Sequence, residues 1–195
     1  MKLIPYGVRW YEEVYFACLH GEGGEIPPWD REERTPQMDR DAACLKAAEI
    51  KPDDRILVCG CGGGNNLMIL AEVCPESRRI TVLDFAPSAV AYCVRHFPYV
   101  TGVIGDVANL PFTDGAFDVL LAMDLTEHLP LPVYAAFLPE SSRVLATGGK
   151  AVFLPGVTAM PEHINTLSPW QISQHCSRAE FNRVRVNKVW AIVEK

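Results

Sequence analysis

Residues 55–65 constrain the fold of this chain more than any other stretch, because an apolar run leads directly into a glycine-rich turn. The apolar run is RILVC, the turn is GCGGGN, and residues 65–73 (NNLMILAEV) follow with the composition of a helix. Glycines let a ligand approach the backbone, and the first turn of a helix offers free N–H groups. A buried strand, a glycine loop and a helix in this order predict a nucleotide-type binding site.

The chain beyond this stretch alternates strand-like and helix-like segments. This alternation predicts a parallel sheet with helices on both faces. Strands are predicted at residues 55–59, 79–84, 100–104, 117–123 and 149–154, and helices at 65–73, 87–96 and 131–145, the last kinked or restarted near Pro139.

The C-terminal tail follows a different pattern. Ser168 and Pro169 indicate the start of a short helix that ends near Arg178. Residues 181–186 and 189–193 flank Asn187-Lys188, a two-residue hairpin turn, so the sheet is expected to end in an antiparallel pair.

The first fifty residues form a helical attachment to a core of residues 52–195, and together they suit one domain of 195 residues. Helices are predicted at residues 8–20 and 36–48, with an extended segment at 26–30 between them. Two interpretations remain open for the aromatic residues of this attachment: a lid over the substrate, or packing against the edge of the sheet. These residues are Trp10, Tyr11, Tyr15 and Trp29.

Composition narrows the functional classes. A net charge of −6 without a basic stripe gives no indication of nucleic-acid binding, and the basic residues Arg178, Arg183, Arg185 and Lys188 suit a solvated hairpin face. The apolar runs are too short to span a membrane, and the first residues do not form a secretory signal. Seven irregularly spaced cysteines indicate reduced thiols, with Cys59 and Cys61 in core packing, and hence a cytoplasmic protein. The sequence gives no indication of the oligomeric state.

The spacing of the glycines separates two kinds of nucleotide site. The dinucleotide fingerprint is G-x-G-x-x-G/A, and its last small residue packs the helix on the strand. Here that position is Asn65, and the spacing is G-x-G-x-G. A dehydrogenase therefore becomes the weaker interpretation.

Five colinear motifs between residues 52 and 195 resemble class I S-adenosylmethionine-dependent methyltransferases. The glycine loop resembles their first motif, and Asp84 closes the next predicted strand, twenty residues after Gly64. The other similar stretches are GDVANLPF (105–112), FDVLLAMDLTEHLP (117–130), ESSRVLATGGK (140–150) and EHINTLSPWQI (162–172). The resemblance is greatest to the branch that includes the ubiquinone and menaquinone biosynthesis methyltransferases.

This resemblance implies a Rossmann-like sandwich with a mostly parallel seven-stranded sheet, a C-terminal antiparallel hairpin and S-adenosyl-L-methionine as cofactor. It implies methyl transfer by in-line displacement to a small-molecule or protein acceptor. The resemblance implies that the glycine loop contacts the methionine and ribose and that Asp84 binds the ribose hydroxyls. The other residues of the implied site contact the adenine or the methyl end. The implied cofactor residues are Gly60, Cys61, Gly62, Gly64, Asp84, Phe85, Asp106, Val107 and Met123.

Position 58 departs from the family pattern, because Val58 stands where relatives have an acidic residue before the loop. The departure favours an alternative in which the fold is retained as a non-catalytic binding or regulatory partner.

The run Asp124-Leu-Thr-Glu127-His128 resembles an E-x-x-E-H sequence that binds a divalent metal in some methyltransferases, and His163 is a further candidate ligand. The interpretation that we adopt assigns no metal. It places Asp124, His128 and His163 around the substrate, where either histidine is a candidate general base.

Overall fold

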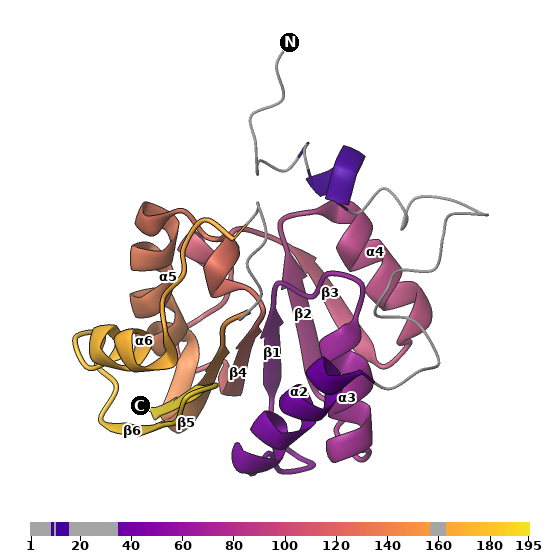
Figure 1. The fold of residues 1–195 in the computed structure, drawn as a ribbon. Coiled ribbons are helices and arrows are strands. Elements are labelled where there is room, and N and C mark those ends of the chain that lie inside the picture. Colours follow the sequence, from indigo (N-terminus) through magenta and orange to yellow (C-terminus); the bar gives the residue numbers. More distant parts are fainter. Residues whose placement is uncertain (1–8, 10, 16–34, 157–162) are drawn as a thin grey trace.

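The computed structural model describes residue 9 and residues 11–15, 35–156 and 163–195 (Figure 1). Its centre is a seven-stranded sheet with the order β3-β2-β1-β4-β5-β7-β6. Five neighbouring strands are parallel: β1 (Ile56–Cys59), β2 (Ile80–Asp84), β3 (Val100–Ile104), β4 (Phe117–Met123) and β5 (Leu145–Leu154). The antiparallel strands β6 (Arg183–Val186) and β7 (Ala191–Glu194) complete the sheet beside β5. The predicted fold class is confirmed.

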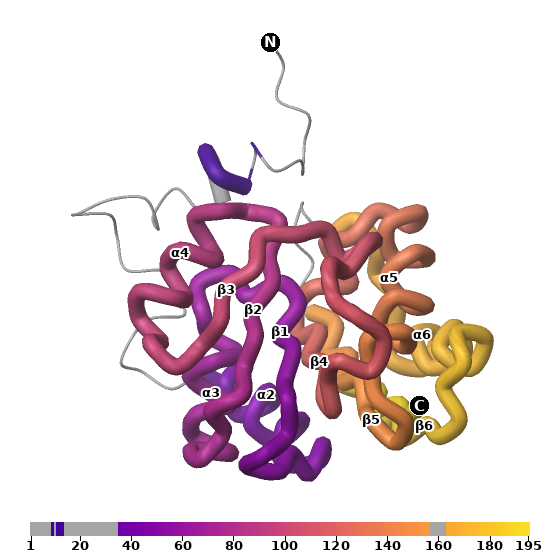
Figure 2. The backbone as a smooth tube through the Cα atoms, turned by 180° about the vertical axis from the view of Figure 1, so that it is seen from behind, coloured from indigo at the N-terminus to yellow at the C-terminus, as the bar shows by residue number. Residues whose placement is uncertain are grey.

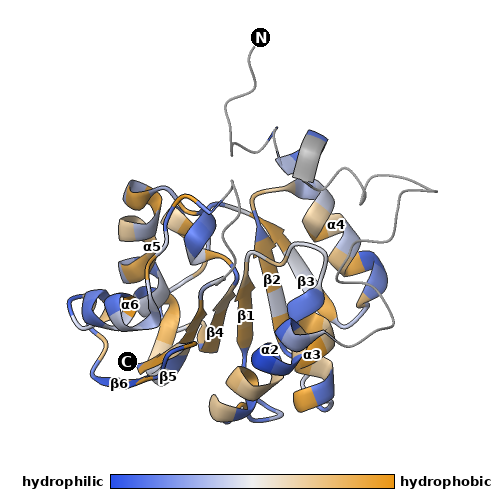
Figure 3. Ribbon diagram, viewed as in Figure 1, coloured by the Kyte–Doolittle hydropathy of each residue, from blue (hydrophilic) through white to orange (hydrophobic). Residues whose placement is uncertain are grey.

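Helices cover both faces of the sheet (Figures 1 and 2). One apolar cluster joins the sheet to α2 (Pro36–Ala47), α3 (Asn65–Val73) and α4 (Pro87–His96). The other joins it to α5 (Leu131–Val144) and α6 (Pro169–Cys176). All four residues of β1 are fully buried, as expected for a parallel strand covered on both sides, and β1 appears in hydrophobic colours in Figure 3.

Three details differ from the sequence prediction. Helix α5 continues through Pro139 without a restart, since a single proline removes only one N–H donor. Strand β5 begins at Leu145, and its pairing with β4 changes register between Phe117 and Val119. The loop between β6 and β7 has four residues because the Asn187 side chain accepts hydrogen bonds from the N–H groups of Val189 and Trp190.

The order of the strands determines where a ligand can bind. From β1 the chain builds outward through β2 and β3, and then returns to the other side of β1 with β4 and β5. The carboxyl ends of β1 and β4 therefore flank the point where the direction of winding reverses. Ligands of open α/β sheets bind in the crevice at this point.

The N-terminal attachment is described only in part. Helix α2 is confirmed, with Thr35 as its N-cap: the Thr35 side chain accepts a hydrogen bond from the N–H of Met38. Residues 11–15 form a single π-helical turn, η1 (Tyr11–Tyr15). The predicted extended segment at 26–30 and the side chains of Trp10, Tyr15 and Trp29 lie outside the described residues.

In the part of the chain that the structure describes, no helix has the length and apolar character needed to cross a bilayer. The six described cysteines are all free and buried, and Cys59 and Cys61 pack in the two apolar clusters.

Candidate functional site

A cavity of about 740 Å³ opens at the carboxyl ends of the parallel strands. The segments that follow β1, β2, β3 and β4 all contribute to its walls, and so do the start of α2 and Tyr11 of η1. Its size is that of a cofactor pocket. The strand order therefore brings together the glycine loop and carboxylates that are far apart in the sequence.

The glycine loop adopts a conformation that explains its spacing. Gly60, Gly62 and Gly64 have positive φ angles of 70°, 47° and 85°, a region that side-chain-bearing residues rarely adopt. Gly64 is the N-cap of α3, so the first turn of that helix begins directly at the cavity wall. Alternate glycines thus allow the chain to turn from β1 into α3 within five residues.

Asp84 ends β2 beside this loop. One oxygen, Oδ2, accepts the N–H of Gly62 at 3.1 Å, and the other, Oδ1, accepts the N–H of Ala86 at 3.0 Å. Burial raises the pKa of Asp84 to about 6, although the backbone N–H groups of Ala86, Gly62 and Phe85 oppose this shift. Each carboxylate oxygen has a second acceptor position, so the group can accept hydrogen bonds from a ligand diol.

The segment after β3 forms the next part of the wall. Asp106 caps the short helix η4 (Val107–Asn109), and its Oδ1 accepts the N–H of Ala108 at 2.9 Å. Val107 is buried beneath it, and both residues line the cavity together with Phe85. An acidic, an apolar and an aromatic side chain are the groups needed to hold a heteroaromatic base.

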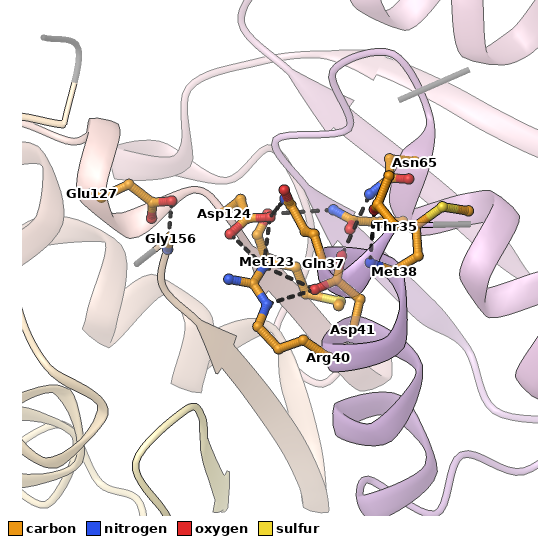
Figure 4. Close-up of polar contacts among 11 residues, drawn as sticks. Thr35, Gln37, Met38, Arg40, Asp41, Asn65, Met123, Asp124, Glu127 and Gly156 are labelled. Carbon is orange, nitrogen blue, oxygen red and sulfur yellow. Dashed lines mark hydrogen bonds and ion pairs between the residues drawn. The ribbon is translucent and has the colours of Figure 1, made fainter. Parts of the chain in front are cut away.

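Hydrogen bonds and an ion pair connect the end of β4 to α2 (Figure 4). The Asp124 carboxylate accepts hydrogen bonds from Arg40 Nη2 at 2.8 and 2.9 Å, and its Oδ2 also accepts one from Gln37 Nε2 at 2.7 Å. Asp124 has a positive φ of 49°, unusual for a residue with a side chain. Next to it, the side-chain amide of Asn66 donates to the carbonyl of Met123 at 3.3 Å.

Arg40 also binds its neighbour Asp41, whose side chain is fully buried, through Nε at 2.9 Å. One guanidinium therefore serves two carboxylates. Burial and the charge of Asp124 together raise the pKa of Asp41 to about 6, and the charge of Arg40 opposes this shift. The Asn65 side chain, at the start of α3, donates to Asp41 Oδ2 at 3.4 Å. Asp41 thus connects α2 to the end of the glycine loop.

Val58, which departs from the family pattern, is fully buried in the apolar cluster shared with α2, α3 and α4. The acidic groups that reach the loop region instead come from Asp41 on α2, Asp84 on β2 and Asp124 after β4.

His128 also lines the cavity, at the end of the short helix η5 (Thr126–His128). Its Nδ1 lies 3.1 Å from the hydroxyl oxygen of Tyr11. The His163 ring is edge-on to the His128 ring at a centroid distance of 4.8 Å. The structure therefore brings both predicted histidines together, with His128 facing the cavity.

Glu127 is buried next to them. Its Oε1 accepts the N–H of Gly156 at 2.6 Å (Figure 4), and its Oε2 is buried without a hydrogen-bond partner in the described structure. Burial raises the pKa of Glu127 to about 7, assisted by the charge of Asp124. Donor atoms of Glu127, His128 and His163 lie within 4.8 Å of one another. Asp124 is the first acidic residue of the 124–128 run that resembles a metal-binding sequence. It does not belong to this group, and its carboxylate is bound by Arg40.

Several lining residues were not identified from the sequence. They are Thr35, Pro36, Gln37 and Met38 of the α2 region and Asn65 and Asn66 of α3. One feature of the sequence could have indicated that α2 contributes to the site. Asp41 is an acidic residue on the same helical face as Leu45, and an acidic residue on an apolar face predicts a buried polar contact.

Residues 56–149 match the family model described as a methyltransferase domain. The chain is 33% identical over 111 residues to a demethylmenaquinone methyltransferase of Beutenbergia cavernae, covering 56% of this chain and 44% of that protein. It is 30% identical over 136 residues to a phthiotriol/phenolphthiotriol dimycocerosates methyltransferase of Mycobacterium leprae, covering 66% and 47%.

The crystal structure of an S-adenosylmethionine-dependent methyltransferase from Aquifex aeolicus superposes with a TM-score of 0.65 at 20% identity, covering 82% of this chain and 92% of that one. The sequence relatives are longer proteins: the chain spans about a third to a half of the first relatives that it matches.

Proposed function

We propose that the chain is a class I methyltransferase that transfers a methyl group from S-adenosylmethionine to a small-molecule acceptor, and the methyltransferase-domain match and the similar proteins support this proposal. One observation carries the proposal. The glycine loop, the Asp84 and Asp106 carboxylates and the end of β4 all line a single cavity at the switch point of the sheet.

The residues present fit the cofactor. Asp84 has acceptor positions left for the ribose hydroxyls after its two backbone contacts. Phe85, Asp106 and Val107 would hold the adenine. Gly60, Cys61 and Gly62 would face the ribose and methionine, and Met123 and Asp124 the methionine end. The fourth predicted loop residue, Gly64, does not line the described cavity: a Cβ there would meet Phe97, and the residue serves as the N-cap of α3.

Bound S-adenosylmethionine supplies an activated methyl group on its sulfonium. The protein therefore has to align an acceptor atom with that group at near-attack distance and exclude water. In this proposal His128 lies next to the acceptor as its proton acceptor, and Asp124 orients the methyl end. His163 acts on the same side through its contact with the His128 ring.

The acceptor side of the cavity supports an apolar acceptor. Leu125, Leu129, Pro130 and Val133 line it near His128. Two of the similar proteins are named for demethylmenaquinone and for phthiotriol/phenolphthiotriol dimycocerosates, which accords with this lining. The proposal treats the chain as one catalytic domain, with residues 52–195 as the cofactor-binding core and residues 1–50 as an attachment to it.

Titration calorimetry with S-adenosylmethionine tests the cofactor assignment. We expect saturable binding to the wild-type chain and binding at least tenfold weaker for Asp106→Asn, which removes the charge at the adenine edge. Asp114→Asn is the matched control, because Asp114 is exposed and pairs with Arg143 away from the cavity. Lack of binding at millimolar cofactor would instead favour the non-catalytic alternative.

A screen of phenolic, hydroxylated and amine acceptors with a radiolabelled methyl donor tests the acceptor class. Label transferred only to polypeptides would contradict a small-molecule acceptor.

A further inference from the structure

The turn η1 contributes Tyr11 to the lining of the cavity and is bound to the start of α4 through Glu12. Glu12 Oε1 accepts hydrogen bonds from the backbone N–H of Ser88 at 3.0 Å and from its hydroxyl at 2.9 Å. Ser88 belongs to the first turn of α4, a helix whose N-cap residue, Ala86, has no capping side chain. Glu12 therefore satisfies a helix terminus that the local sequence leaves open.

The neighbouring residue, Tyr11, contacts both Phe85 after β2 and His128 after β4. Its ring meets Phe85 edge-to-face at a centroid distance of 5.0 Å, and its hydroxyl oxygen lies 3.1 Å from Nδ1 of His128. Only 6% of Tyr11 is exposed, and its contact with His128 is partly buried. One side chain thus contacts both the proposed adenine side and the histidine on the acceptor side.

We propose that Tyr11 is a positioning residue that accepts the Nδ1 proton of His128 and so keeps the lone pair on Nε2 for the methyl acceptor. The inference rests on the proposed function. The tautomer of a neutral imidazole is determined by the hydrogen bond that one of its nitrogens makes. A tyrosine hydroxyl can accept this bond without adding a charge, which leaves the imidazole basic.

The inference limits the class of acceptor. The acceptor's electron pair forms the new bond to the methyl carbon, the carbon–sulfur bond breaks, and its electrons remain on sulfur. The proton lost by the acceptor moves to Nε2 of His128. A base is needed only where the methylated atom carries a proton, so the acceptor should present a hydroxyl, an amine or an acidic C–H group.

Other titratable groups also surround His128. Glu127 precedes it in the chain, and the His163 ring packs edge-on against it. Neither contact involves Tyr11, so a change at Tyr11 can be separated from them. The chain also contains a matched pair: the Tyr134 hydroxyl lies 3.1 Å from Nδ1 of His175, between α5 and α6.

Nitrogen-15 NMR of the imidazole rings tests the proposal without a known acceptor. At a pH where His128 is neutral, we expect the wild-type ring to carry its proton on Nδ1, and Tyr11→Phe to shift the tautomer ratio toward Nε2–H by about tenfold. His128→Gln assigns the signals. Tyr134→Phe should change His175 and leave His128 unaltered.

Two results would overturn the inference. One is a wild-type His128 that carries its proton on Nε2, and the other is an unchanged tautomer ratio in Tyr11→Phe. The His175 signals report whether that variant keeps its fold.

Calorimetry separates this inference from the proposed function. Tyr11→Phe keeps the ring that contacts Phe85, so its affinity for S-adenosylmethionine should stay within about twofold of the wild type. If the wild type does not bind the cofactor, the proposed function fails whatever the tautomer. If it binds and the tautomer is wrong, only the role of Tyr11 fails.

Discussion

Replacing Arg40 with methionine should destabilise the protein in a strongly pH-dependent way. Arg40 Nη2 lies 2.8 Å from a carboxylate oxygen of both Asp41 and Asp124, and the exposed fractions of these three side chains are 15%, 0% and 24%. Without Arg40, Asp41 retains only the 3.4 Å hydrogen bond from Asn65 among the hydrogen bonds described.

The magnitude follows from the burial of these charges. Leaving a buried charge without its partner costs about 3–5 kcal/mol. We expect a value near 3 kcal/mol at pH 8, because Asp124 is partly exposed and its charge is partly screened. Methionine retains most of the apolar stem of arginine, so little of the loss should come from packing.

The pH dependence follows from linkage. The pKa of Asp41 is already raised to about 6 in the folded protein, and loss of Arg40 raises it further. The folded variant then binds a proton that the unfolded chain does not, so its stability falls as the pH rises from about 4 through this raised pKa. At pH 5 the carboxyl is neutral, and the loss should fall to about 1 kcal/mol.

Urea unfolding at pH 5 and pH 8, followed by circular dichroism, measures both values. Asp41→Asn in the Arg40→Met background should restore about 2 kcal/mol at pH 8, since it removes the unpaired charge. Equal losses at the two pH values, or no restoration by the second substitution, would refute the reasoning.

Three further predictions concern the loop, the cofactor and a helix terminus. Affinity for S-adenosylmethionine should fall below about pH 6, where Asp84 takes up a proton and loses an acceptor for the ribose; constant affinity from pH 5 to 8 in calorimetry would contradict this. Gly64→Ala should cost about 2 kcal/mol or more in urea unfolding, because φ is 85° and the new Cβ would lie 2.5 Å from Phe97 Cε2. Gly148→Ala, with φ of 79° and open space around it, should lose only about 1 kcal/mol; a loss as large as that of Gly64→Ala would argue against the Phe97 contact. Ser168→Ala removes the capping box of α6 and should cost about 1 kcal/mol in the same assay, whereas an unchanged midpoint would show that the cap is not stabilising.

The parallel core could be predicted from the sequence because its signals are local. Residues 65–73, 87–96, 100–104 and 117–123 form the predicted helices and strands with the predicted bounds. Each has a continuous apolar pattern bounded by glycine, proline or a polar turn. The positions of Asp84 and Asp106 at the cavity also follow, since the carboxyl ends of parallel strands share one edge of the sheet.

The hydrogen bonds and ion pairs of the site could not be predicted, because they join residues that are distant in the sequence. The pair of Arg40 and Asp124 joins residues 84 positions apart, and the pair of Tyr11 and His128 joins residues 117 apart. No periodicity indicates which helix faces which strand end. For the same reason, the resemblance of residues 124–128 to a metal-binding sequence suggested that Asp124 lies with Glu127 and His128, whereas the structure pairs Asp124 with Arg40 of α2.

The buried thiols offer a way to observe the protein opening. Cys44, Cys61 and Cys93 belong to the apolar cluster between the sheet and helices α2, α3 and α4, and Cys59 and Cys176 belong to the cluster between the sheet and helices α5 and α6. Burial raises the pKa of Cys44 and Cys176 to about 12, so neither reacts as a thiolate until its surroundings separate. The labelling rate of each thiol by an alkylating reagent therefore reports the free energy of local opening at its own position. If the two layers separate independently, cofactor binding should slow labelling at Cys61, in the glycine loop, more than at Cys176. Native cysteines could then resolve ligand-induced stabilisation layer by layer, without an introduced probe.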